Sequence, residues 1–342
     1  MLRFAHFVNN LLKGDMRHYF KFCTECVLSY LGEKGWKMAR SERVYQNFLL
    51  DSTRWDHLEE RADDIIIATP YKCGTTWTQN IVLHLIFQDL KLRVISDYSP
   101  WVDMRIQPIQ ELLEQLEGQE HRRCMKSHLP RDGLVLREKS KYIIVGRDPR
   151  DVFMSLWNHY SNYTDDFIVE VNETPGRVGP PLMPCPKDIL ELWEMWIKRG
   201  WFEWETEGYP HWSNLRHVQT WWNDRERSNI LFVHYNDLLA DLGGEIRRIS
   251  DYLGIECTEE KLSAIANLVT FTSMKRDAGK LDPNAGDAFR GGANTFFNKG
   301  TNGRWQGVLT SDDLEMYDDA VARELTADCH NWLENGRLNS LN

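Results

Sequence analysis

The stretch "DDIIIATPYKCGTTWTQNIV", residues 63 to 82, joins an apolar run to a polar loop and then to a mixed stretch. The consecutive isoleucines are typical of a strand buried on both faces of a sheet. After the strand, Gly74 permits a tight turn, and the amides of residues 73 to 77 are expected to point outward at the start of a helix. Thr75 and Thr76 add hydroxyl donors and Lys72 adds a positive charge. This set of groups favours a bound phosphate.

Two other readings of the loop stay open at this point. A Walker A loop has a second glycine and places its lysine after that glycine, whereas Lys72 precedes Gly74 here. The order of residues therefore disfavours hydrolysis of a nucleoside triphosphate. Alternatively, Thr75 caps the helix and Lys72 is merely solvated.

The order of strand, turn and helix recurs along the chain. It appears in "KYIIVGRDPRDVFMSLWNHY", residues 141 to 160, and in "NILFVHYNDLLADL", residues 229 to 242. Strands that alternate with helices predict an α/β fold, with a mainly parallel sheet covered by helices on both faces. We expect a single domain, with its ligands beyond the carboxyl ends of the strands.

Polar residues follow two more of the predicted strands. Arg147 comes directly after one strand, and Ser155 lies eight residues later in the next helix, so both could address a second phosphate. The alternative for Arg147 is an ion pair with Asp148 or Asp151. In "HRRCMKSHLP", residues 121 to 130, alternation places Lys126 and His128 on one face of a strand, although a histidine here is often structural.

Charge and composition narrow the setting. The 342 residues include 41 lysines and arginines against 51 acidic residues, a net charge of −10, which disfavours nucleic acid or an anionic membrane as a partner. Seven cysteines at irregular spacing indicate a reducing compartment, and the Cys23 and Cys26 pair lacks the second pair of a zinc site. Residues 1 to 22 lack the apolar core of a signal peptide, and the chain has no long apolar run. We expect a cytoplasmic protein without a metal.

We predict an N-terminal helical extension over residues 1–50, packed on the core, and a catalytic domain over 51–342. The proline-rich segment 165–187 is expected to be a long irregular loop. If this loop folds back, Val178, Leu182 and Met183 would line the entrance for an acceptor as a lid. The alternative is a solvated insertion without a role.

Four segments resemble motifs of the cytosolic sulfotransferases. Residues 72–77 are similar to the family's Lys-Ser-Gly-Thr-Thr-Trp loop, and residues 126–130 to its Lys-Thr-His-Leu-Pro. Residues 147–155 have the Arg-to-Ser spacing of its 3′-phosphate segment, and residues 296–305 resemble Arg-Lys-Gly-x-x-Gly-Asp-Trp. The motifs occur in the family's order over most of the chain.

The resemblance implies an activity. The family transfers a sulfuryl group in line from 3′-phosphoadenosine 5′-phosphosulfate (PAPS) to a hydroxyl or amine, leaving adenosine 3′,5′-bisphosphate (PAP). His128 matches the general base, Lys72 the lysine at the leaving phosphate, and Lys126 the lysine near the sulfuryl oxygens. The implied cofactor-binding residues are Lys72, Cys73, Gly74, Thr75, Thr76, Trp77, Arg147, Ser155, Tyr235, Phe271, Met274, Lys299 and Gly300. Among them, Trp77 would stack on adenine and Tyr235 would touch its edge, though either aromatic could be a core residue.

The sequence departs from the family pattern at several positions. Cys73 stands in place of serine, and Val269 in place of threonine. Asn298 stands where the family has an arginine that contacts the 3′-phosphate. Arg304 stands where the family has an aspartate, and one hypothesis is that Arg304 supplies the positive charge that Asn298 lacks. The family's dimer patch is not recognisable near residues 306–311, so the oligomeric state stays open.

Three functional classes remain: a sulfotransferase, a nucleotide-binding protein of the same fold without catalysis, and a kinase-like phosphoryl transferase. The catalytic residue types favour the first. The acceptor is expected to be a small apolar or aromatic molecule; phenols, alcohols, steroids and lipids all fit. The aromatic stretch at residues 192–212 is a candidate for part of its pocket.

Overall fold

The computed structural model describes residues 41–339. Its central sheet has four parallel strands in the order β2-β1-β3-β4. The strands are β1 Ile65–Ala68, β2 Cys124–Ser127, β3 Lys141–Gly146 and β4 Ile230–His234. All four residues of β1 are buried, as the isoleucine run predicted. The predicted α/β fold with a mainly parallel sheet is confirmed.

Helices connect the strands and complete the domain. The α-helices are α3 Thr75–Phe87, α4 Ile95–Tyr98, α5 Ile109–Glu117, α6 Pro149–Ser161, α7 Asp165–Glu173, α8 Ile189–Lys198, α9 Leu215–Trp222, α10 Tyr235–Ala240, α11 Leu242–Leu253, α12 Glu259–Leu268, α13 Phe271–Arg276, α14 Ala278–Leu281, α15 Ala285–Ala288, α16 Ala293–Phe296, α17 Ser311–Glu324 and α18 Ala327–Asn335. Two 3₁₀ turns, Ser52–His57 and Arg131–Gly133, complete the set.

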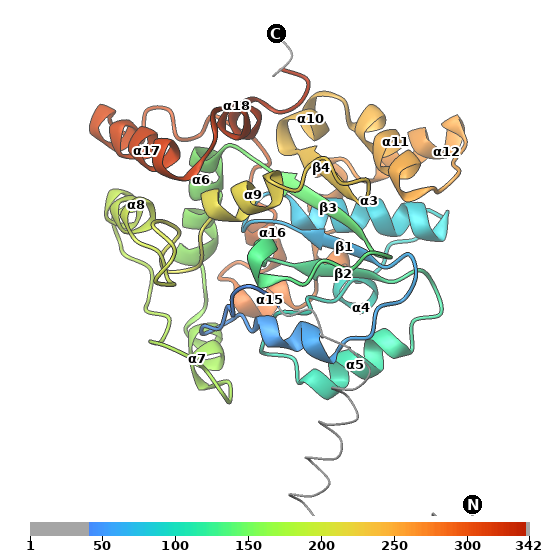
Figure 1. Ribbon diagram of the computed structural model, residues 1–342, viewed down its shortest axis with the longest axis horizontal. Coiled ribbons are helices and arrows are strands. Elements are labelled where there is room, and N and C mark those ends of the chain that lie inside the picture. The colour runs from blue at the N-terminus through green and yellow to red at the C-terminus, as the bar shows by residue number, and fades with distance from the viewer. Residues whose placement is uncertain (1–40, 340–342) are drawn as a thin grey trace, which may run out of the picture. The chain divides into compact units, whose positions relative to one another are not determined.

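Alternate residues of the strands feed two separate cores. Ile65 and Ile67 of β1 belong to a cluster with residues of α3, α11 and α12, whereas Ile66 and Ala68 belong to a cluster with residues of α6, α8 and α9. Figure 1 shows α11 and α12 at the right of the sheet and α6 and α8 at its left. Helices therefore cover both faces, because each pleated strand sends successive side chains to opposite sides.

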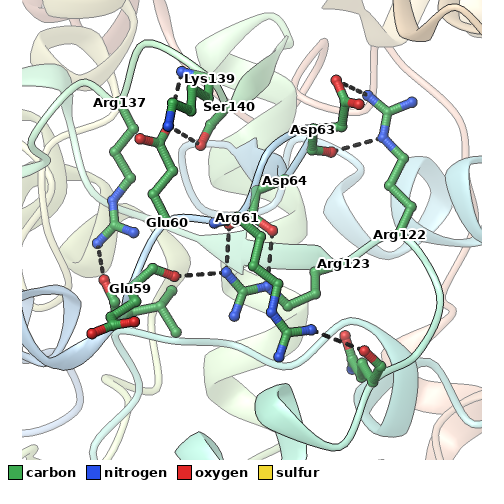
Figure 2. A network of polar contacts seen from close by, with 12 residues as sticks. Glu59, Glu60, Arg61, Asp63, Asp64, Arg122, Arg123, Arg137, Lys139 and Ser140 are labelled. Atoms are coloured by element: carbon green, nitrogen blue, oxygen red, sulfur yellow. Dashed lines mark hydrogen bonds and ion pairs between the residues drawn. The ribbon is translucent and has the colours of Figure 1, made fainter.

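The amino ends of the strands are joined by a network of charged groups (Figure 2). At its centre the Arg123 guanidinium donates to both carboxylate oxygens of Asp64, at 2.8 and 2.6 Å, and both side chains are 1% exposed. Arg122 and Arg137 donate to backbone carbonyls nearby. This network lies at the amino ends of the strands, whereas the loops that follow the strands leave from the carboxyl ends. It therefore holds the strands together at the end opposite to those loops.

Two predictions about segments differ from the structure. Residues 165–173 are helical rather than irregular, because Thr164 caps α7 by accepting from the Phe167 N–H and the prolines begin only at residue 175. Residues 41–50 contain no helix; they pack into the core through buried Tyr45 and Phe48. The rest of the predicted N-terminal extension, with Cys23 and Cys26, lies outside the described residues.

Candidate active site

A cavity of about 1060 Å³ lies at the carboxyl ends of the strands. Lys72, Lys126, His128, Arg147 and Ser155 all line it, although they come from three different strand-to-helix connections. The sheet therefore brings together the catalytic residues that the sequence predicted. The volume of the cavity is sufficient for a nucleotide and a small second molecule.

The loop after β1 presents a helix start without a capping side chain. Gly74 is the N-cap of α3 in the left-handed conformation, with φ 102°, and it makes no side-chain cap bond. A side chain at this position would also meet the ring of Tyr235 at 3.0 Å. The Thr75 hydroxyl bonds to the Thr69 hydroxyl at 2.6 Å instead of capping the helix. The amides of the first turn are thus available to an anion, as a phosphate site requires.

Cys73 contributes to this loop through its backbone alone. Its side chain is fully buried, outside the cavity lining, and its thiol lies near the Tyr71 carbonyl and the Asn214 amide. Burial raises the pKa of the Cys73 thiol to about 12, so the thiolate needed for oxidation is scarce at neutral pH.

Lys72 and Lys126 are cations without a carboxylate partner. Among the described residues, the Lys126 ammonium has no hydrogen-bond or ion-pair partner; it lies 4.0 Å from the centre of the Trp101 ring. The Lys72 ammonium bonds to Nδ1 of His159 at 2.9 Å. Burial lowers the pKa of Lys72 to about 7, with further lowering by Lys126 and Arg147, and burial lowers the pKa of Lys126 to about 8. Two desolvated ammonium groups of this kind fit the anionic donor group of PAPS.

His128 has one ring nitrogen engaged by the protein. Its Nδ1 lies 2.7 Å from the Thr69 carbonyl oxygen, which accepts only, so Nδ1 carries the proton and Nε2 has a free lone pair. Burial and the charge of Lys126 hold the pKa of His128 well below its ordinary value. His128 is therefore neutral in the free protein, which is the form that accepts a proton.

Asp103 contacts His128, and no motif or spacing in the sequence pointed to it. The buried carboxylate accepts from the His128 backbone N–H at 3.0 Å and from the Trp101 indole N–H at 2.7 Å. The Trp101 ring lies edge-on to His128, with 4.7 Å between centroids. Asp103 thus holds both the backbone of His128 and the Trp101 ring beside it.

His159 is a second residue that the sequence analysis missed. It follows Ser155 by four residues on α6, so both lie on one face of the helix and both line the cavity. Its Nε2 bonds to the Tyr71 hydroxyl at 2.7 Å, and this hydroxyl bonds to that of Tyr163 at 2.9 Å. The spacing from Ser155 was the available signal.

Arg147 is held by the C-terminal motif rather than by Asp148 or Asp151. Its guanidinium donates to Oδ1 of Asn302 at 2.8 and 3.1 Å and to the Thr301 carbonyl at 3.1 Å. Arg304 also lines the cavity, and burial and the like charge of Arg147 lower its pKa. A second guanidinium therefore occupies the region where Asn298 lacks one.

Four residues predicted to surround the adenine line the cavity: three aromatic residues, Trp77, Tyr235 and Phe271, and Met274. The Trp77 indole donates to the Val269 carbonyl at 2.8 Å, so the valine that replaces threonine acts through its backbone. Lys299 and Gly300 line the same region. Gly300 has φ 66°, and a Cβ there would lie 2.4 Å from the Phe271 ring, which explains the glycine.

The predictions for the acceptor side were partly wrong. Val178 and Met183 are exposed and Leu182 is buried, and none of the three lines the cavity. The aromatic stretch 192–212 also contributes nothing to the lining, because its rings, such as Trp193 and Trp196, fill the core. The apolar residues that do line the cavity outside the four motifs include Trp101, Met104, Ile106, Phe167 and Phe289.

The chain matches the sulfotransferase domain family model over residues 62–329. It is 34% identical to the glycolipid sulfotransferase Rv1373 of Mycobacterium tuberculosis over 311 residues, which cover 86% of this chain and 94% of the relative. Sulfotransferase 1A1 of Rattus norvegicus is 27% identical over 276 residues, covering 78% and 86% of the two chains.

Solved structures share the fold. Retinol dehydratase in complex with androsterone and PAP matches with a TM-score of 0.63 and 21% identity, over 80% of this chain and 84% of that chain. Mouse sulfotransferase SULT7A1 complexed with PAP matches with a TM-score of 0.61 and 21% identity, over 82% and 90%. The family model and the similarity to the relatives over most of their length show that this chain is an enzyme of the sulfotransferase family.

Proposed function

We propose that the protein transfers a sulfuryl group from PAPS to a hydroxyl or amine of an amphiphilic acceptor, in line, with His128 as general base. One observation carries the proposal: two partly buried lysine ammonium groups, which have no carboxylate partner among residues 41–339, line one cavity together with a neutral imidazole. PAPS supplies an activated sulfuryl group when bound. Residues 72–77, Arg147, Ser155, Lys299 and Arg304 would hold its phosphates, with Trp77, Tyr235, Phe271 and Met274 around the adenine.

The role of each catalytic residue follows from its chemistry. Nε2 of His128 takes the proton of the attacking hydroxyl, while Nδ1 stays bonded to the Thr69 carbonyl. Lys72 stabilises negative charge on the leaving phosphate, and Lys126 stabilises charge on the sulfuryl oxygens. The walls of Trp101 and Phe167 exclude water from this region.

The acceptor class follows from the second part of the lining. Apolar and aromatic side chains surround the side of the cavity near His128, and they favour an acceptor with a sizeable apolar part. The glycolipid named for the mycobacterial relative is an acceptor of this type. Among the described residues, no helix is long and apolar enough to cross a membrane. We propose a cytoplasmic location, to which the unpaired state of the five described cysteines lends support.

The test is PAPS-dependent sulfation of a panel of hydroxylated amphiphiles, read by mass spectrometry, with His128→Ala and His128→Asn as variants. Both should lose at least about 100-fold in kcat while PAP affinity stays within about twofold, because a general base contributes to the acceptor and not to the nucleotide. His57→Ala, at an exposed position, serves as control. Activity above a tenth of the unmodified protein in both variants would remove His128 as the base.

A further inference from the structure

The charged residues of the cavity are sorted by the segments from which they come. Every lysine or arginine of the lining lies within the four nucleotide motifs, and every carboxylate lies outside them. The cations are Lys72, Lys126, Arg147, Lys299 and Arg304. The carboxylates are Asp97, Asp166, Glu170, Asp282 and Asp287. These carboxylates come from segments to which the proposed function assigns no nucleotide contact, so they are available to an acceptor.

Three of these carboxylates belong to one wall, made by α7 and α15. The Thr164 N–H donates to the Ala288 carbonyl at 3.0 Å, and its hydroxyl donates to the Asp287 carbonyl at 3.0 Å. Asp166 and Glu170 are four residues apart on α7 and face the cavity together. The wall carries negative charge and the Phe167 ring, so it combines a polar and an apolar contact surface.

Asp282 is the lining carboxylate whose charge acts on both Lys72 and Lys126. It is partly buried, and its Oδ1 accepts from the Ala285 N–H at 3.1 Å. Among residues 41–339, Oδ2 has no protein donor and the carboxylate has no ion-pair partner. Burial raises the pKa of Asp282, while the charges of Lys126 and Lys72 act in the opposite direction. Once those lysines are engaged by an anionic donor, Oδ2 remains for a group on the acceptor.

We propose that the acceptor side of this cavity selects by charge, with Asp282 as the main specificity-determining residue. The cavity accepts amphiphiles whose polar part carries an ammonium group or uncharged hydrogen-bond donors. It excludes amphiphiles that carry a carboxylate, phosphate or sulfate. This inference rests on the proposed function. The exposed carboxylates Asp166, Glu170 and Asp287 act at the entrance, where salt screens them; Asp282 acts inside, where screening is weaker.

The test compares three phenols of one shape that differ in charge: tyramine, tyrosol and 4-hydroxyphenylacetate. In low salt, kcat/KM should fall in that order, with tyramine above 4-hydroxyphenylacetate by at least about 30-fold. Asp282→Asn keeps the oxygen that accepts from Ala285 and should reduce this ratio about tenfold without lowering PAP affinity. The double variant D166N/E170Q should reduce it about threefold, and this effect should vanish in high salt.

Glu173→Gln is the matched control, because Glu173 is on α7, exposed and outside the lining, so the ratio should not change.

If a phenol is not turned over, dissociation constants for the three compounds with PAP-loaded protein give the same comparison. Equal values for tyramine and 4-hydroxyphenylacetate, or no binding of any of them up to about 10 mM, overturn the inference. A ratio of tyramine to 4-hydroxyphenylacetate that is unchanged in Asp282→Asn also overturns the inference. If Asp282→Asn does not bind PAP, the same comparison is made with Asp282→Ser. Failure of the unmodified protein to bind PAP would overturn the proposed function instead.

Discussion

Lys72 combines an unusual backbone conformation with an unusual charge environment. Its φ of 65° lies in the left-handed region, which residues other than glycine rarely adopt. Its ammonium lines the cavity and bonds to Nδ1 of His159. Strain of this kind persists where the surrounding structure enforces it, here through the loop between β1 and α3.

The lowered pKa of Lys72 makes PAP binding dependent on pH. The ammonium form binds phosphate, and with a pKa of about 7 in the free protein it is lost as pH rises. Affinity should therefore fall about fivefold between pH 7 and pH 8 through Lys72, and more steeply above pH 8 as Lys126 titrates, while PAP keeps almost all of its charge. Isothermal titration calorimetry in buffers of different ionisation enthalpy should detect proton uptake at pH 8. Lys72→Met should bind weakly but without the slope between pH 7 and 8; a flat profile for the unmodified protein contradicts this assignment.

At the scale of elements, β1 has different tasks at its two ends. Its carboxyl end leads into the phosphate loop, and its amino end is fixed by the buried Asp64 and Arg123 pair (Figure 2). A buried charge without its partner is costly, so the pair holds β1 and β2 together only while both members are present.

Asp64→Ala should lower the free energy of unfolding by about 3 kcal/mol, because it removes the bidentate partner of the buried Arg123 guanidinium and leaves only the exposed Glu117 carboxylate, 3.6 Å away, to pair with it. Denaturation in urea measures this. Asp63→Asn is the control: the carboxylate is 71% exposed and 3.9 Å from Arg122, and asparagine tolerates the φ of 66° at this position, so the change should cost less than about 1 kcal/mol. Equal losses in both variants would show that the buried pair has no special weight.

Helix α7 contributes Phe167 to the cavity lining, whereas the apolar residues expected there, in the loop after α7, do not line it. Phe167 lines the cavity, whereas Val169 on the same helix is 50% exposed. Phe167→Ala should raise the acceptor KM about three- to tenfold with PAP affinity unchanged, because the ring contacts the acceptor and not the nucleotide. Val169→Ala should leave both unchanged. Steady-state kinetics with an apolar acceptor decides, and an unaltered KM for Phe167→Ala would place the acceptor elsewhere.

At the scale of the whole molecule, one cavity connects loops that are far apart in the chain. Arg147 joins the loop after β3 to the C-terminal motif through Asn302, and the Lys72 carbonyl lies 3.3 Å from the same guanidinium. A ligand held by all three segments stabilises the folded state only if they are assembled.

Saturating PAP should therefore raise the midpoint of thermal unfolding by about 5 °C at 100 times its dissociation constant. Adenosine 5′-phosphate at equal concentration should give a smaller shift, because it lacks the 3′-phosphate. Differential scanning calorimetry of Arg147→Ala should show similar, small shifts for the two nucleotides. If the variant keeps the full advantage of PAP, Arg147 does not contact the 3′-phosphate.

The sequence determined the sheet, the phosphate loop and the cluster of Lys72, Lys126 and His128. These features depend on local signals: runs of β-branched residues, a glycine turn and residues directly after strands. The tertiary structure alone brought Asp103 to His128, His159 to Lys72, and Asp282 into the same cavity lining, because these residues come from separate connections. It also placed the aromatic stretch 192–212 in the core, because burial depends on which face of a helix meets the sheet, and composition does not specify that face.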